Sequence, residues 1–368
     1  MIRIDGRNRM NSQTKPVLPT GVGIAFAAAA LFGGSTPLAK LLLGGVSPVL
    51  LAGLLYLGSG VGLSLVRLAR RQRISAAGEA ALPRSQWGWL AGAVFFGGAL
   101  GPALLMLGLQ STQAATASLL LNMEGVFTAL LAWFVFRENF DRRIALGMVA
   151  IVAGGLLLSW QPGAGLAFTR GALFVLGACL CWGVDNNLTQ KVSSSDPFQI
   201  AAIKGLVAGS VNMAIALALG ASLPAWQVLV GALIVGFFGY GLSLACFVLA
   251  LRHIGTARTG AYFSLAPFAG ALASLGLLHE SVGPLFVAAG VLMGLGVWLH
   301  LTENHEHPHG HERLEHAHRH VHDEHHQHEH AAGVAATEPH SHSHVHEPLA
   351  HSHAHFPDIH HRHEHHAQ

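Results

Sequence analysis

The sequence predicts an all-α membrane protein: a polytopic bundle of ten transmembrane helices in two inverted five-helix repeats, followed by a disordered C-terminal tail. Hydrophobic residues make up 51% of the chain and charged residues only 11%, whereas a soluble domain carries about 25% charged residues. Apolar runs of about 20 residues, long enough to cross a bilayer, recur along the chain. The charges are also divided, because residues 1–300 have a formal net charge of +10 and residues 301–368 one of −8.

The apolar body contains ten candidate spans. The first follows a basic N-terminal segment, residues 1–17, and is long enough to stay in the membrane as an anchor rather than be cleaved as a signal peptide. The fifth and tenth spans are the shortest. The predicted spans cover residues 18–40, 47–67, 87–109, 114–136, 143–160, 170–190, 197–220, 226–250, 257–279 and 283–300.

Proline and tryptophan mark the ends of several spans. Ser47-Pro48 and Asp196-Pro197 each pair a capping side chain with a proline at the first helical position, and Pro284 opens the last span in a similar way. Tryptophan prefers the interface between the bilayer and water. The tryptophans near predicted span ends are Trp87, Trp89, Trp133, Trp160, Trp226 and Trp298.

Basic residues predict which ends of the spans face the cytoplasm. If the N-terminus is inside, fifteen Lys and Arg residues lie on inner segments and only Lys40 and Arg170 on outer ones. Cytoplasmic loops carry such an excess of positive charge. We therefore expect a multi-pass protein of the cell (inner or plasma) membrane, with both termini in the cytoplasm.

A weak internal repeat relates the two halves. A shift of 142 residues aligns the fourth span with the ninth and matches Glu138 with Glu280, a rare residue type that ends a span in both copies. Because each half has five helices, the second half enters the membrane from the opposite side. Inverted repeats of this kind are common in secondary transporters, whose substrate sites lie near the midplane between the halves.

Short motifs recur in an order that resembles a known family. In the first repeat they are residues 32–40 (FGGSTPLAK), Val46-Ser47-Pro48, residues 107–112 (LGLQST) and Arg137-Glu138. In the second repeat they are residues 181–187 (CWGVDNN), Asp196-Pro197, residues 250–254 (ALRHI), and Leu265-Ala266-Pro267 through His279-Glu280. On these motifs the chain resembles the drug/metabolite transporter (DMT) superfamily, specifically the EamA-type transporters with two repeats.

The resemblance implies two EamA-like domains, residues 18–160 and 170–301, and a gradient-driven transporter that works by alternating access. The chain departs from the family at two positions. Glu124-Gly125 stands where the family often has a proline, and early in the second span an apolar residue or Tyr56 stands where many members have an arginine. The tail, residues 303–368, has no counterpart in the family core.

Ionisable side chains inside the spans are few, and each is a candidate for the transport pathway because a charge in the bilayer is costly. Asp185 in the sixth span and Lys204 in the seventh are predicted to lie at similar depth and to form an ion pair. The pair is either a gated site beside Asn186 and Asn187 or a structural lock between the two helices.

Other candidates lie in the fourth, sixth and ninth spans. Glu124, close to Asn122, is either a site of proton or cation coupling or a structural hydrogen-bonded acid with no role in transport. Trp182 either lines a ligand cavity or packs in the core. Pro102 and Pro267 lie in the middle of spans and predict kinked or broken helices that line the pathway.

The tail contains 24 of the 27 histidines and almost no large apolar side chains, so we expect it to be disordered. Histidine alternates with other residues, which lets neighbouring imidazoles bind one divalent transition metal, Zn²⁺, Ni²⁺, Cu²⁺ or Co²⁺. The predicted ligands are His305, His307, His309, His311, His316, His318, His320, His322, His340, His342, His344, His346, His351, His353 and His355.

The sequence lacks a glycine-rich nucleotide loop and a convergent catalytic set in the spans, so we expect neither ATP-driven transport nor an enzyme. No cofactor is expected to be required, and nucleic acid is not an expected partner. The expected partners are the lipid bilayer, a small-molecule substrate and transition-metal ions, with a homodimer as one possibility.

The predicted function is transport of a small metabolite or drug-like solute, with the tail as a metal-binding regulator. The alternative is a metal-responsive or metal-handling membrane protein for Ni, Co, Zn or Cu, in which the tail acts as buffer or sensor. A third interpretation of the tail is a low-complexity expansion with little role.

Overall fold

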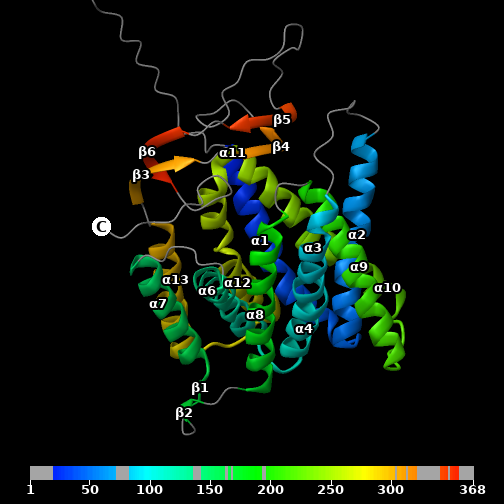
Figure 1. The fold of residues 1–368 in the computed structure, drawn as a ribbon. Helices are drawn as coiled ribbons and strands as arrows, with labels where there is room; N and C mark the ends of the chain where they lie inside the picture. The colour runs from blue at the N-terminus through cyan, green and yellow to red at the C-terminus, as the bar shows by residue number, and fades with distance from the viewer. Residues whose placement is uncertain are drawn as a thin grey trace, which may run out of the picture.

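The computed structural model shown in Figure 1 describes residues 20–71, 83–135, 142–161, 165–166, 169–192, 196–302, 305–311, 314–320, 340–346 and 349–355. Some sequence predictions lie outside these residues. They are the N-terminal segment 1–17, the Arg137-Glu138 motif and His322.

Two of the five crossings in the first repeat are interrupted. The third contains a π-helical segment, η2, and the fourth is broken by a turn between two short helices. The elements are α1 (Thr20–Leu42), α2 (Pro48–Arg71), η1 (Arg84–Gln86), α3 (Trp87–Ala93), η2 (Val94–Leu100), α4 (Gly101–Ser111), α5 (Ala114–Leu120), α6 (Met123–Phe134) and α7 (Arg142–Leu158).

The second repeat follows the same plan. Its π-helical segment η3 ends at Leu242, 142 residues after the end of η2 at Leu100, so the two segments are equivalent under the shift seen in the sequence. The elements are the hairpin β1 (Trp160–Gln161) and β2 (Gly165–Leu166), then α8 (Arg170–Gln190), α9 (Pro197–Ala218), α10 (Trp226–Gly236), η3 (Phe237–Leu242), α11 (Ser243–Phe263), α12 (Ala266–Leu278) and α13 (Pro284–Leu301).

The fold is the predicted polytopic helical bundle. Within the described residues, seven helical segments are long and apolar enough to cross a membrane, and two shorter apolar helices, Ala266–Leu278 and Pro284–His300, accompany them. This set is compatible with ten crossings. Figure 1 places the tail strands at one end of the bundle and the β1–β2 hairpin at the opposite end.

The eighth and ninth spans are separated where the sequence predicts it. Helix α11 covers Ser243–Phe263, but the ring centroids of Phe247 and Phe263 lie only 4.8 Å apart, so the chain reverses direction between these two residues. A straight helix would separate them by about 24 Å, at 1.5 Å per residue. The candidate span in this region ends at Ala250.

Both prolines lie at interruptions within a crossing, as predicted. Pro102 follows the π-helical segment η2 in the continuous helical span Arg84–Ser111, and Pro267 follows the turn at residues 264–265 that precedes α12.

The tail, predicted to be disordered, has paired strands where its backbone is described. Strand β3 (His305–His311) pairs with β6 (Leu349–His355), and β4 (Leu314–His320) pairs with β5 (His340–His346), both antiparallel. The period-two alternation of histidine matches the repeat of a strand, a signal that the lack of apolar side chains obscures. The registers align histidine with histidine, for example His307 with His353 and His318 with His342.

The two repeats are interleaved. Helix α1 packs against α11 and α12 of the second repeat, while its counterpart α8 packs against α4 and α6 of the first. One close contact of each helix is equivalent in the two copies. A Cβ at Gly33 in α1 would meet the amide nitrogen of Gly270, and one at Gly183 in α8 would meet the amide nitrogen of Thr128, 142 residues before Gly270. This correspondence places the pseudo-symmetry axis between the repeats.

Candidate functional site

A buried ion pair joins α8 to α9. Lys204 Nζ donates a hydrogen bond to Asp185 Oδ2, and the Thr189 hydroxyl donates to Asp185 Oδ1 at 3.0 Å. The Lys204 side chain is 16% exposed and the Asp185 side chain 7%. The ion pair predicted from the sequence is therefore present.

Two glycines of η2, Gly97 and Gly98, pack directly against this ion pair. A Cβ at Gly97 would collide with the Asp185 carboxylate, and one at Gly98 would approach the side chains of Lys204 and Ala208. Only a residue without a side chain lets the third crossing come this close to the pair. The equivalent glycine of η3, Gly239, faces Ser35 instead, so the second copy of this contact is uncharged.

The carbonyl of Gly97 is bonded by side chains rather than by its own helix. Gly101 N–H donates to Phe96 O, five residues earlier, and the next donor in this π-helical series would be Pro102, which has no N–H. The Tyr56 hydroxyl and Trp182 Nε1 donate to Gly97 O instead, at 2.7 and 3.0 Å.

Asn212 supports the same segment from α9 by donating to Ala99 O at 3.0 Å. Sequence reasoning missed Tyr56 and Asn212 as parts of the site. The proline two residues after a Gly-Gly-Ala-Leu run was the available signal, because it predicts unpaired carbonyls that buried donors must satisfy.

A second polar centre lies on the other side of α8. Glu124 is in the first turn of α6, directly after the break in the fourth crossing. Asn186 Nδ2 donates to Glu124 Oε1 at 2.8 Å and to Thr128 Oγ1 at 3.2 Å. Asn187 Nδ2 donates to Thr128 O at 3.1 Å, so two neighbouring amides of α8 hold α6.

The break itself is stabilised by Asn122. Its Nδ2 donates to Leu119 O at 2.9 Å and lies 3.9 Å from Met293 Sδ in α13. Glu124 also interacts electrostatically with Asp185 and Lys204. The structure thus gathers most predicted pathway residues of the fourth, sixth and seventh crossings around α8, whereas Asn122 faces Met293 of α13. Pro267 stands apart on α12, which packs against α1 and α5.

Aromatic rings from both repeats surround this region. The ring centroid of Phe32 in α1 lies 6.5 Å from that of Trp182, 5.8 Å from that of Tyr240 and 5.4 Å from that of Phe263. Tyr56 and Tyr240 are 5.4 Å apart. Trp182 therefore packs among aromatic rings and also donates a hydrogen bond to the Gly97 carbonyl in η2.

A separate charged cluster ties the bundle together at the end that carries the β1–β2 hairpin. Lys40 Nζ, near the end of α1, donates to Leu109 O and, at 2.9 Å, to Thr112 O. Glu280, after α12, accepts from Ala114 N–H and Ala115 N–H, both at 2.8 Å. We call this cluster the end clamp. It consists of Lys40, Glu280 and the connection between α4 and α5, to whose backbone both side chains are hydrogen-bonded.

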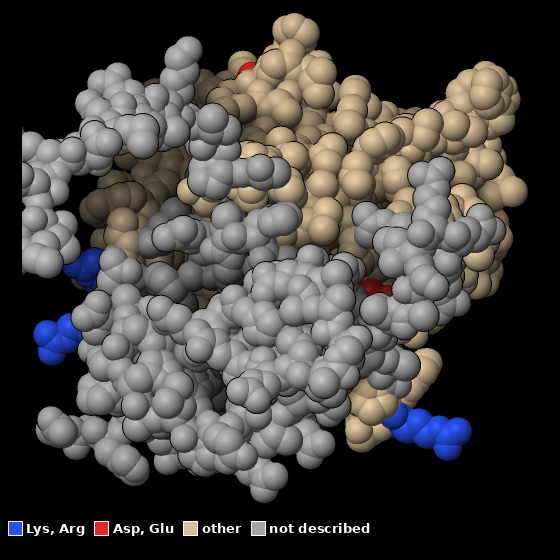
Figure 2. Space-filling model, turned by 90° about the horizontal axis from the view of Figure 1, so that it is seen from above, with Lys and Arg blue, Asp and Glu red and all other residues tan. Residues whose placement is uncertain are grey.

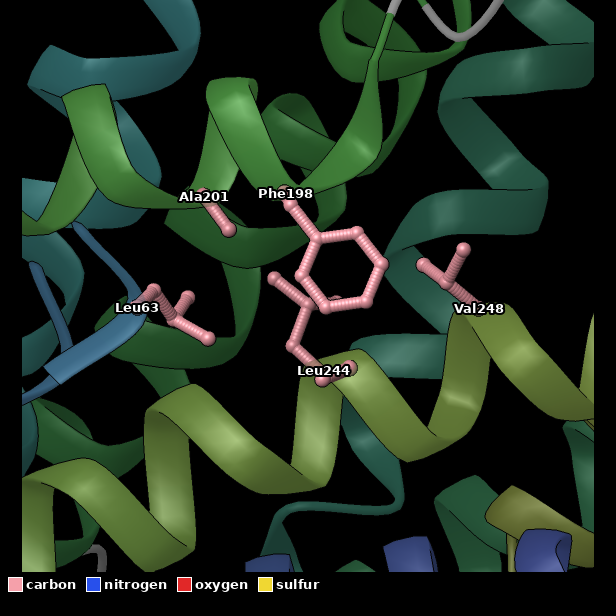
Figure 3. A pocket seen from close by; sticks show the side chains of 6 residues that line it. Leu63, Phe198, Ala201, Leu244 and Val248 are labelled. Atoms are coloured by element: carbon pink, nitrogen blue, oxygen red, sulfur yellow. The ribbon is translucent and has the colours of Figure 1, made fainter. Parts of the chain in front are cut away.

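Two other features of the described residues do not form a site. The pocket in Figure 3, lined by Leu63, Phe198, Ala201, Leu244, Ala245 and Val248, presents apolar side chains only. Among side chains that the structure describes, no three or more His, Cys, Asp or Glu residues gather as a metal site. The tail histidines are not among those side chains.

These features define the class of the protein: a membrane transporter of two interleaved five-helix repeats with a charged centre between them. The chain belongs to the EamA-like transporter family, whose model matches residues 19–160 and 169–302.

Relatives support the same class. An uncharacterized transporter of Methanothermobacter thermautotrophicus is 30% identical over 286 residues, which cover 74% of this chain and 83% of that protein. A probable 4-amino-4-deoxy-L-arabinose-phosphoundecaprenol flippase subunit, ArnE, of Pseudomonas paraeruginosa is 38% identical over 113 residues, 31% of this chain and 96% of that subunit. A protein of known crystal structure shares the fold with a TM-score of 0.57 at 18% identity, over 76% of this chain and 95% of that chain.

Proposed function

We propose that this transporter is driven by a transmembrane gradient and moves a small metabolite or drug-like solute by alternating access between its two repeats. The observation that supports this most is the polar network of Glu124, Asp185 and Lys204 inside an otherwise apolar bundle. Ionisable groups at such positions are typically retained for the passage of substrate or ions.

The geometry suggests how an ion and a substrate are coupled. Asp185 and Asn186 are neighbours on α8, and they contact Lys204 of the second repeat and Glu124 of the first. A proton or cation bound by Glu124 removes a negative charge beside the Asp185–Lys204 pair. Because the pair rests on η2 of the first repeat, a change in its charge balance alters the contact between the repeats.

An untargeted comparison of metabolites tests the proposed transport. Cells that express the wild type, Glu124→Gln or no transporter are grown in parallel, and the contents of medium and cells are compared. We expect a small set of solutes to be redistributed by the wild type only. Equal profiles for the wild type and for cells without the protein, at verified expression, argue against a metabolite transporter.

For the tail, we propose binding of Zn²⁺, Ni²⁺, Cu²⁺ or Co²⁺ by the alternating histidines, with a regulatory effect on transport. The alternation of imidazoles and the histidine-to-histidine registers support it. The alternative function, metal handling with the tail as buffer or sensor, predicts that deletion of residues 303–368 lowers metal tolerance and changes cellular metal content. The regulatory proposal predicts altered solute transport with unchanged tolerance.

We also propose that the end of the bundle with the tail faces the cytoplasm. The excess of basic residues on that side supports this orientation. In the view from this end, described Lys and Arg side chains project at the edge of the molecule (Figure 2). Such side chains are placed to reach the phosphate region of a membrane.

A further inference from the structure

The end clamp matches charges to the ends of two consecutive helices. Lys40 donates to carbonyls at the end of α4, and Glu280 accepts from amides at the start of α5. The end of a helix carries partial negative charge and its start partial positive charge, so each side chain has the favourable sign. Lys40 and Glu280 also attract each other.

The end clamp joins crossings that belong to different repeats. Lys40 lies in the last turn of α1 and bonds the connection at residues 112–113, and this helix and this connection belong to the first repeat. Glu280 follows α12 of the second repeat. An opening of this end of the bundle must therefore break the hydrogen bonds of Glu280 to α5.

A second observation is consistent with an end of the bundle that can open. Among the described residues, the buried side-chain oxygens without a hydrogen-bond partner are Thr112 Oγ1 and Ser118 Oγ. Thr112 lies inside the end clamp, and Ser118, on α5 directly beneath it, is fully buried. A buried hydroxyl without a partner is unfavourable, and water in an opened state would satisfy both groups.

We propose that Lys40 and Glu280 form the gate at the hairpin end of the pathway, and that the structure shows this gate closed. The proposal rests on the alternating-access mechanism proposed above, but its test needs no substrate. Glu280 is the central element, because its carboxylate joins the two repeats at this end. Because the labelling test needs no substrate, failure of the gate proposal can be distinguished from failure of the transport proposal.

A cysteine at position 118 reports opening of the gate. Ser118→Cys is introduced after Cys179, Cys181 and Cys246 have been replaced by alanine, and its reaction with a membrane-impermeant maleimide is timed in intact cells and in inside-out vesicles. The test variants are Glu280→Gln and Lys40→Gln. The matched control is Asp196→Asn, which makes the same carboxylate-to-amide change at the opposite end of the bundle.

We expect Glu280→Gln to accelerate the labelling by about tenfold or more from one side of the membrane, since hydrogen bonds to a charged group stabilise the closed state. Lys40→Gln is expected to accelerate it less, and it provides the test if Glu280→Gln does not reach the membrane. Acceleration in intact cells, where the hairpin end faces the reagent in the orientation proposed above, supports the gate. Labelling of both variants at the rate of the Asp196→Asn control overturns the proposal.

Discussion

Replacement of Asp185 by Asn removes the counterion of Lys204 while preserving the shape of the side chain. Lys204 is 16% exposed, and its ammonium group donates a hydrogen bond to the Asp185 carboxylate. Loss of one partner from a buried ion pair costs about 3–5 kcal/mol, because the other charge is left uncompensated. We therefore expect Asp185→Asn to lower the free energy of unfolding by about 3 kcal/mol or more.

The double variant Asp185→Asn with Lys204→Gln separates the burial of a lone charge from other effects. It removes both charges, so it should be clearly more stable than Asp185→Asn alone, with a coupling energy of about 2–3 kcal/mol. The Arg67–Asp196 pair offers a control, because its side chains are 27% and 15% exposed and lie at an end of the bundle. Asp196→Asn should cost only about 1 kcal/mol or less, since it removes an ion pair of modest value while asparagine still caps the helix.

Unfolding of the purified variants in lipid nanodiscs measures these differences. The single variant Lys204→Gln completes the cycle. The reasoning is refuted if Asp185→Asn costs no more than Asp196→Asn, or if the double variant loses the sum of the effects of Asp185→Asn and Lys204→Gln. The first result would mean that Lys204 is solvated or finds another acceptor. The second would mean that the two side chains do not interact.

Three further predictions concern close packing, the η2 carbonyl and the tail. Gly33→Ala should destabilise the protein by about 1–3 kcal/mol, because its Cβ would meet the backbone of α12. Gly34→Ala has open space around it and should be neutral or slightly stabilising. Unfolding of the two variants in nanodiscs compares them. Tyr56→Phe should cost about 1 kcal/mol in the same assay, because Gly97 O keeps only Trp182 as a donor. Calorimetry should show Ni²⁺ or Zn²⁺ binding at pH 7.5 by the full chain but not after deletion of residues 303–368, and binding should weaken below about pH 6, where imidazole becomes protonated.

Much of the fold was predictable because a bilayer constrains it. The sixth span was predicted at its observed bounds, Arg170–Gln190, and Asp196 caps α9 as expected by accepting from Phe198 N–H. Interruptions within a crossing were predictable only where a proline marks them. Pro267 follows the break in the ninth crossing, whereas the break in the fourth crossing, before Glu124-Gly125, has no proline to signal it.

The ionisable residues of the site were predictable because they are rare in the spans. Asp185, Lys204 and Glu124 stand out in an apolar sequence, and their depth along the helices was enough to predict the ion pair. Their supports were not predictable in this way. Tyr56 is an ordinary aromatic residue until the π-helical segment exposes the Gly97 carbonyl to it, and one sequence does not reveal the π-helix.

Transport by purified protein tests the central claim, that Glu124 couples a gradient to solute movement. The solute found by the metabolite screen is supplied to proteoliposomes of wild type and Glu124→Gln, with and without an imposed proton or cation gradient. We predict that the wild type accumulates the solute only with the gradient, and that Glu124→Gln exchanges it across the membrane without accumulation. Accumulation by Glu124→Gln at the wild-type level would contradict the assignment of Glu124 as the coupling residue.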